Sequence, residues 1–107
     1  MLLAKLEELW KKLSRHKISN DELCYLIVRI KIKSIREKVA RRLLNQEPSN
    51  EDLLCIILYV ESLRPKAWKE LLKRRLTNDD LCCIIENVES LREVAWKKLL
   101  KRGKIRE

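Results

Sequence analysis

Residues 62–74 read SLRPKAWKELLKR, and the pattern returns 28 positions later as SLREVAWKKLLKR at residues 90–102. Upstream, residues 34–44 read SIREKVARRLL and begin 28 positions before Ser62. A period of this length is typical of stacked repeat proteins, in which each unit buries its apolar face against the next. The repeat therefore predicts an all-α fold, a right-handed α-solenoid of antiparallel helix pairs.

A second block marks the start of another helix in each unit. It reads SNDEL at residues 19–23, SNEDL at 49–53 and TNDDL at 77–81. Its first residue can cap a helix N-terminus, and the acidic residue three positions later completes a capping box. We call the helices that begin here A-type. The B-type helices, which carry the first repeat pattern, are expected to have their own serine caps: Ser34, Ser62 and Ser90.

Together the two blocks predict about seven helices, with one B-type helix at the N-terminus followed by three A–B pairs. The apolar residues of the A-type segments follow the i, i+3, i+4 spacing of an amphipathic helix, as at Leu53, Ile56 and Ile57. A chain of 107 residues is expected to form one domain. We divide this domain, 1–107, into a half repeat (1–18), three repeats (19–46, 47–75 and 76–103) and a short tail (104–107).

The composition excludes several classes of protein. A single glycine and two prolines leave no room for a flexible linker or a glycine-rich phosphate loop. No apolar stretch approaches the roughly 18 residues of a membrane span. The N-terminal sequence MLLAKLEE meets charge too early for a secretory signal. The sequence therefore predicts a soluble, cytoplasmic protein with no membrane partner.

The four cysteines are predicted to pack as small apolar side chains rather than to perform chemistry. A metal site is disfavoured because no two cysteines have the Cys-x-x-Cys spacing. A nucleophile would need a base, and the single histidine, His16, lies in another segment. We therefore predict no catalytic residue, metal or cofactor, and no enzyme. Each pair of cysteines shares a repeat column, meaning equivalent positions in successive repeats: Cys24 with Cys82, and Cys55 with Cys83.

The three tryptophans share a further repeat column, in which Ala40 is the fourth member. Alanines precede Trp68 and Trp96, which indicates close helix packing. We therefore favour packing between repeats over an exposed aromatic ladder for peptides or bases. Trp96 is the expected exception, because no repeat follows it.

Charge is distributed unevenly between the two helix types. The formal net charge is +9, with +15 on the B-type segments and −6 on the A-type segments. Because all B-type helices of a solenoid line one face, the excess predicts a basic face. This face could be merely solvated, could bind the phosphates of nucleic acid, or could dock an acidic protein. Its candidate residues are Arg41, Arg42, Lys69, Lys73, Arg74, Arg75, Lys97, Lys98, Lys101 and Arg102.

Arginine also recurs near the start of the B-type helices, at Arg36, Arg64 and Arg92. A cation at a helix N-terminus opposes the helix dipole, so the recurrence needs a structural reason. We expect these side chains to bond to Glu61, to Glu89 or to a neighbouring repeat, rather than to a ligand.

The rhythm of REVAWKKLL at residues 92–100 and TNDDL at 77–81 resembles short HEAT-like repeats and leucine-rich-repeat-variant units, which are all-helical despite their name. The resemblance covers roughly residues 4–102. It implies an α-solenoid that presents surfaces to protein partners and sometimes to nucleic acid. The period is longer than the usual variant unit, and the cysteine cluster of an iron–sulfur member has no counterpart here. The resemblance therefore implies no cofactor.

The leading hypothesis for function is a protein-interaction scaffold. The alternative is a nucleic-acid-binding module that uses the basic face. The C-terminal end adds a further expectation, because a terminal repeat normally needs a polar outer surface. Leu91, Trp96 and Leu99 are predicted to be partly uncovered there and to allow end-to-end self-association or membership of a larger assembly.

Overall fold

The computed structural model describes residues 2–102 and confirms the all-helical prediction for that part of the chain. It contains seven α-helices, one short 3₁₀-helix and no β-strand within those residues. The elements are α1 (Leu2–Leu13), α2 (Asn20–Arg29), α3 (Lys33–Leu44), α4 (Asn50–Tyr59), η1 (Glu61–Leu63), α5 (Arg64–Leu72), α6 (Asn78–Asn87) and α7 (Glu89–Lys101). The predicted tail, 104–107, lies outside the described residues, as do Met1 and Gly103.

The A-type helices α2, α4 and α6 begin at the predicted caps. Ser19, Ser49 and Thr77 each accept a hydrogen bond from the backbone N–H three residues later. The acidic side chain at that third position accepts from the backbone N–H of the cap residue, which completes all three capping boxes. Aspartate closes two of these boxes, although it is shorter than the glutamate that this motif usually uses.

The predicted serine caps of the B-type helices are wrong. Ser34 and Ser90 each lie inside a helix, and Ser62 lies in the 3₁₀-helix η1. The residues at the N-cap positions of α3, α5 and α7 make no side-chain cap hydrogen bond: Ile32, Leu63 and Val88. The connection from the preceding helix is as short as one residue, Val88, before α7. The chain therefore enters the new helix before it reaches the serine.

The repeated arginine joins this short connection to the preceding helix. Arg64 Nε donates to the Ile57 carbonyl at 2.8 Å, and Arg92 Nε donates to the Ile85 carbonyl at 2.7 Å. Arg36 donates to the carbonyl of Ile30 and, across to the next repeat, to that of Tyr59. The role is structural, as predicted, but the acceptors are carbonyls near helix C-termini and not Glu61 or Glu89. A cation is favourable at that end of the helix dipole.

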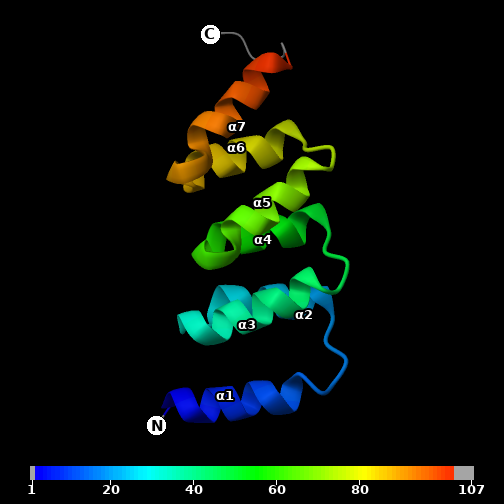
Figure 1. The fold of residues 1–107 in the computed structure, drawn as a ribbon, viewed down its shortest axis with the longest axis vertical. Coiled ribbons are helices and arrows are strands. Elements are labelled where there is room, and N and C mark those ends of the chain that lie inside the picture. Colours follow the sequence, from blue (N-terminus) through cyan, green and yellow to red (C-terminus); the bar gives the residue numbers. More distant parts are fainter. Residues whose placement is uncertain (1, 103–107) are drawn as a thin grey trace.

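The helices are arranged in successive layers along a long axis (Figure 1). Helix α2 packs against α3, α4 against α5, and α6 against α7. Contacts between layers run from α2 to α4 and from α4 to α6, and α1 contacts α3. The molecule is elongated, with extents of 52 × 25 × 17 Å. Its two ends therefore differ, because α1 stands alone at one end and the α6–α7 pair forms the other.

The core follows the repeat columns. Leu23, Leu53 and Leu81 of the A-type helices are fully buried. Full burial of a leucine contributes about 2 kcal/mol relative to exposure, so each layer adds a comparable increment of stability. Two columns of the B-type helices are also fully or almost fully buried: Val39, Ala67 and Ala95, and Leu43, Leu71 and Leu99.

Candidate binding surfaces

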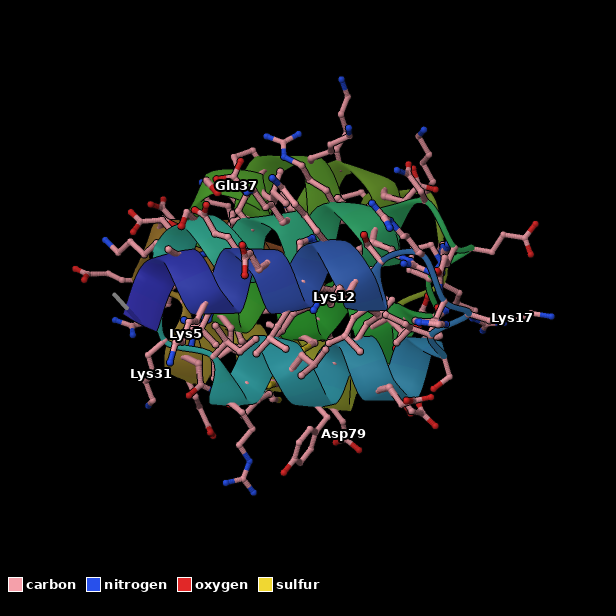
Figure 2. The ribbon with its side chains drawn as sticks, turned by 90° about the horizontal axis from the view of Figure 1, so that it is seen from below. Lys5, Lys12, Lys17, Lys31, Glu37 and Asp79 are labelled. Carbon is pink, nitrogen blue, oxygen red and sulfur yellow. The ribbon has the colours of Figure 1, made fainter. Side chains whose placement is uncertain are left out.

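The predicted basic residues come from α3, α5 and α7 and from the turns after α5 and α7. Figure 2 looks along the stack from the α1 end and places Glu37 of α3 and Asp79 of α6 at opposite edges. In successive repeats, one repeat column holds Arg41, Lys69 and Lys97, and all three side chains are exposed. The B-type helices thus carry a row of cations on their outer side.

Three arginines of the predicted basic face are used to hold the fold together. Arg74 donates to the Pro48 carbonyl at 2.6 Å, and Arg102 donates to Asn78 Oδ1 at 2.8 Å. The guanidinium of Arg42 donates to backbone carbonyls in the turn that follows α1. These three side chains hydrogen-bond to segments more than 20 residues away along the chain and thus serve the fold.

Three further members of the face form surface ion pairs within one turn of their own helices. Arg41 pairs with Glu37 at 2.6 Å, and Lys97 pairs with Glu93 at 3.2 Å. Lys73 pairs with Glu70 at 3.4 Å. Exposed pairs of this kind contribute about 0.3–0.5 kcal/mol and leave the cation accessible. The remaining four make no ion pair within residues 2–102: Lys69, Arg75, Lys98 and Lys101.

The C-terminal end is only partly uncovered. Trp96 is 42% exposed, as predicted, whereas Trp68 in the preceding repeat is 8% exposed. Leu91 is half-buried and packs against the core. Leu99 is 1% exposed, so its predicted uncovering is wrong. Its repeat column packs between the two helices of a pair, where α6 covers it.

The N-terminal end also exposes apolar side chains, and this exposure was not predicted from the sequence. Leu9 is 53% exposed, Leu13 is 44% exposed and Tyr25 is 60% exposed. A groove of about 380 Å³ lies between α1 and α2. The signal was present in the sequence, because Leu9 and Leu13 match core positions of the later repeats although α1 has no A-type partner. The groove is lined by Leu13, Ile18, Asp21, Glu22, Tyr25 and Leu26.

The cysteines do not behave alike. Cys24 and Cys55 are partly buried between α2 and α4 and pack against the core, as predicted. Cys82 is exposed, so the packing prediction is wrong for it. In the equivalent position of the preceding repeat, Leu54 is 9% exposed beneath the next layer, and no such layer covers Cys82 within residues 2–102.

The Cys24 thiol takes part in a polar contact between layers. Its Sγ donates to Asp52 Oδ1 at 3.2 Å, and Asn20 Nδ2 donates to Asp52 Oδ2 at 3.2 Å. Burial, followed by the hydrogen bond to Asp52, raises the pKa of the Cys24 thiol well above its usual range. Burial also raises the pKa of Cys55. Both groups are held as thiols, which are poor nucleophiles and poor metal ligands.

The exposed and buried cysteines are expected to differ in their rates of thiol alkylation. At pH 8, iodoacetamide should modify Cys82 at least tenfold faster than Cys24, because the thiolate is the reactive form and Cys24 is buried with a raised pKa. Raising the pH from 8 to 9.5 should leave Cys24 slow in the folded protein. Mass spectrometry of peptides after timed quenching measures both rates. Equal rates for the two residues would contradict the thiol–carboxylate contact.

The described residues contain no group of three or more histidine, cysteine, aspartate or glutamate side chains placed to hold a metal ion. Within residues 2–102, no helix has the length and hydrophobicity to cross a membrane. Comparison of the chain with protein-family models, with curated proteins and with solved structures found no match. The surfaces described above are therefore the basis for a functional proposal.

Proposed function

We propose that the chain is a short right-handed α-solenoid, built from antiparallel helix pairs, whose function is to bind a partner protein. Side-chain hydrogen bonds support the antiparallel pairing. They join the start of an A-type helix to the end of the B-type helix that follows it. Asn20 bonds with Gln46 in the first repeat, and Asn78 with Arg102 in the last. The sequential contacts α2–α4–α6 support a continuous stack.

The observation that carries the binding function is the apolar surface at the N-terminal end. Leu9, Leu13 and Tyr25 are large side chains that are each more than two-fifths exposed. Contiguous apolar surface with a polar rim is typical of sites that bind other proteins. Residues that contribute most to binding in such interfaces are enriched in tryptophan, tyrosine and arginine, and Tyr25 is of this kind. We therefore assign the chain to the scaffold class rather than to the enzymes.

Nucleic-acid binding is the second candidate, and the unpaired cations on the B-type helices favour it. Lys69, Arg75 and Lys101 are exposed and make no ion pair within residues 2–102. Such side chains can replace the counterions condensed on phosphates. The case is weaker than the charge alone indicates, because Arg42, Arg74 and Arg102 already serve the fold.

A display selection tests the proposed function. A library of amphipathic helical peptides, selected against the 107-residue protein, should yield binders with micromolar or tighter affinity. Reversing four charges together (Lys69→Glu, Lys73→Glu, Lys97→Glu and Lys101→Glu) should change their affinity less than about threefold, because apolar contact supplies the binding energy. The same variant serves as the control for nucleic acid, measured by fluorescence anisotropy with labelled DNA and RNA.

Two results together would contradict the proposal. One is a selection that enriches no peptide. The other is tight nucleic-acid binding that falls about a thousandfold between roughly 50 and 200 mM salt and is abolished by the four charge reversals. That pair of results would establish the basic face as the binding site and the nucleic-acid function in place of the scaffold function.

A further inference from the structure

Within residues 2–102, α3, α5 and α7 each pack against an A-type helix, and α1 has no such helix beside it. Leu9 is 53% exposed, whereas Val39 in the same repeat column is fully buried. Leu13 is 44% exposed, whereas Leu43 is fully buried. In the later repeats these columns are covered by the A-type helix of the same pair, since α2 packs against α3 and α4 against α5. Within residues 2–102, no helix covers this face of α1.

In the part of the chain that the structure describes, no helix packs on the corresponding side of α2. In the next layer, α4 meets α2 through Asp52 and Cys55, which bond to residues of α2. The equivalent positions on α2 are Glu22 and Tyr25, and Tyr25 is 60% exposed. This face of α2 would contact an A-type helix placed before it, as α4 contacts α2.

The two uncovered faces meet in the groove between α1 and α2. Leu13 lines it from α1, and Tyr25 and Leu26 line it from α2, while Asp21 and Glu22 provide an acidic rim. A helix placed in this groove would lie against α1 and α2 as α2 lies against α3 and α4. The groove therefore fits a single α-helix of the A type.

We propose that this groove binds one amphipathic α-helix of a partner protein. The proposal rests on the proposed scaffold function and names the partner segment. Helix α2 is the template for the occupant: Leu23 and Ile27 are fully buried on its packed face. On the same helix, Asn20 and Cys24 donate to Asp52 in the next layer. We number the occupant from position i, which corresponds to Asn20 of α2. It then has hydrogen-bond donors at i and i+4, and leucine or isoleucine at i+3 and i+7.

The acidic rim of the groove indicates which donor side chains the occupant should carry. Glu22 stands in the repeat column of Asp52, so the donors of the occupant face a carboxylate. Asp21 lies beside Glu22 on the rim. Charge-assisted hydrogen bonds to a carboxylate are stronger than neutral ones, and cations complement the acidic first turn of α2. Lysine, arginine or asparagine at i and i+4 therefore fits this groove better than an acidic residue.

A second copy of this chain fits the groove poorly. At the C-terminal end, α6 and α7 are packed together as a pair. Placing α6 of one molecule in the groove of another would direct its α7 to the position that α1 already occupies. The single free position beside α1 matches one helix and not a pair.

A synthetic peptide tests the proposal. The probe spans residues 18–31 of this sequence, carries Cys24→Lys, is capped at both ends and is labelled for fluorescence anisotropy. We expect it to bind the 107-residue protein with a dissociation constant in the micromolar range. A matched peptide that also carries Ile27→Asp should bind at least tenfold more weakly, because it places a charge on the apolar face.

Variants of the protein locate the binding site. Leu13→Lys should weaken binding of the probe at least tenfold, and Glu22→Gln should weaken it about threefold while keeping the capping box, which glutamine also forms. Leu13 is 44% exposed, so its substitution should leave the thermal midpoint within a few degrees. Leu72→Lys is the control, because Leu72 is 38% exposed and lies on α5, away from the groove.

The outcomes separate this inference from the proposed function. If the display-selected peptides bind Leu13→Lys as well as they bind the unmodified protein, the scaffold function stands and the groove is not its site. If no peptide is selected and nucleic acid binds with the salt dependence described above, the proposed function falls. If the labelled probe does not bind, this inference falls. A mass that rises with concentration and returns to the monomer in Leu13→Lys would identify a second copy as the occupant and overturn the proposal of a partner helix.

Discussion

Replacing Leu43 with alanine is expected to lower the free energy of unfolding by about 3 kcal/mol, within the range for large cavities in cores. The side chain is fully buried in α3, beneath α2. Leu13→Ala, in the same repeat column, should cost less than about 1 kcal/mol, because that side chain is 44% exposed. Urea unfolding monitored by circular dichroism measures both values.

The pair of variants compares the same residue type in the same repeat column and helix face. The difference therefore isolates whether a covering helix is present. If both substitutions cost about 3 kcal/mol, Leu13 is buried in solution and the groove between α1 and α2 is closed. That result would remove the basis of the proposed helix-binding site.

Asp52→Ala is expected to lower the free energy of unfolding by about 2–4 kcal/mol. About 1 kcal/mol of this is the loss of the capping box that the carboxylate forms with Ser49 at the start of α4. The remainder comes from the donors that lose their acceptor between layers, Asn20 and Cys24. Both donors are only partly buried, and Asn20 Nδ2 keeps the Gln46 carbonyl as an acceptor, so each lost bond contributes about 0.5–1.5 kcal/mol.

Asp80→Ala is the matched control for this prediction. Asp80 closes the capping box with Thr77 at the start of α6, and no inter-layer hydrogen bond to it is formed within residues 2–102. Its removal should therefore cost only about 1 kcal/mol. Equal losses for Asp52→Ala and Asp80→Ala in urea unfolding would show that the contact between layers adds nothing to the cap.

The A-type helix starts were predictable because the signals are local. A serine or threonine followed by an acidic residue three positions later satisfies backbone groups within one turn, whatever surrounds it. The B-type starts were not predictable from their serines. There only one to four residues separate the preceding helix from the next one, and the chain turns directly into it. The arginine that follows bonds to carbonyls near the end of the earlier helix, and a carbonyl has no sequence signature.

The residues of the basic face could be predicted from the sequence. Which of them are already hydrogen-bonded within the fold could not. The charge of each helix is read from the sequence, whereas the use of a particular arginine depends on which carbonyl lies beside it. Arg74 illustrates this, since its acceptors Pro48 and Asn50 are more than 20 residues away along the chain. Lys69, on the helix that precedes Arg74, makes no ion pair within residues 2–102.

The exposure of apolar side chains was predicted in part at the C-terminal end of the stack and was not predicted at the N-terminal end. Trp96 was expected to be uncovered because no repeat follows it, and the structure agrees. Leu99 is buried because it faces α6, so the sequence position near the end did not determine its exposure. Leu9 and Leu13 are exposed because no A-type helix packs against α1 within residues 2–102. Comparison of repeat columns contains that information, but only the packed structure shows the resulting groove.

The most direct test of the account is a chemical-shift map of the ¹⁵N-labelled protein titrated with the peptide of residues 18–31 that carries Cys24→Lys. We expect the largest shifts on both sides of the groove, at Leu13 and Ile18 and at Glu22 and Tyr25. Amides near Lys69 and Lys101 should be nearly unchanged. Shifts confined to α5 and α7, or no shifts at millimolar peptide, would contradict it.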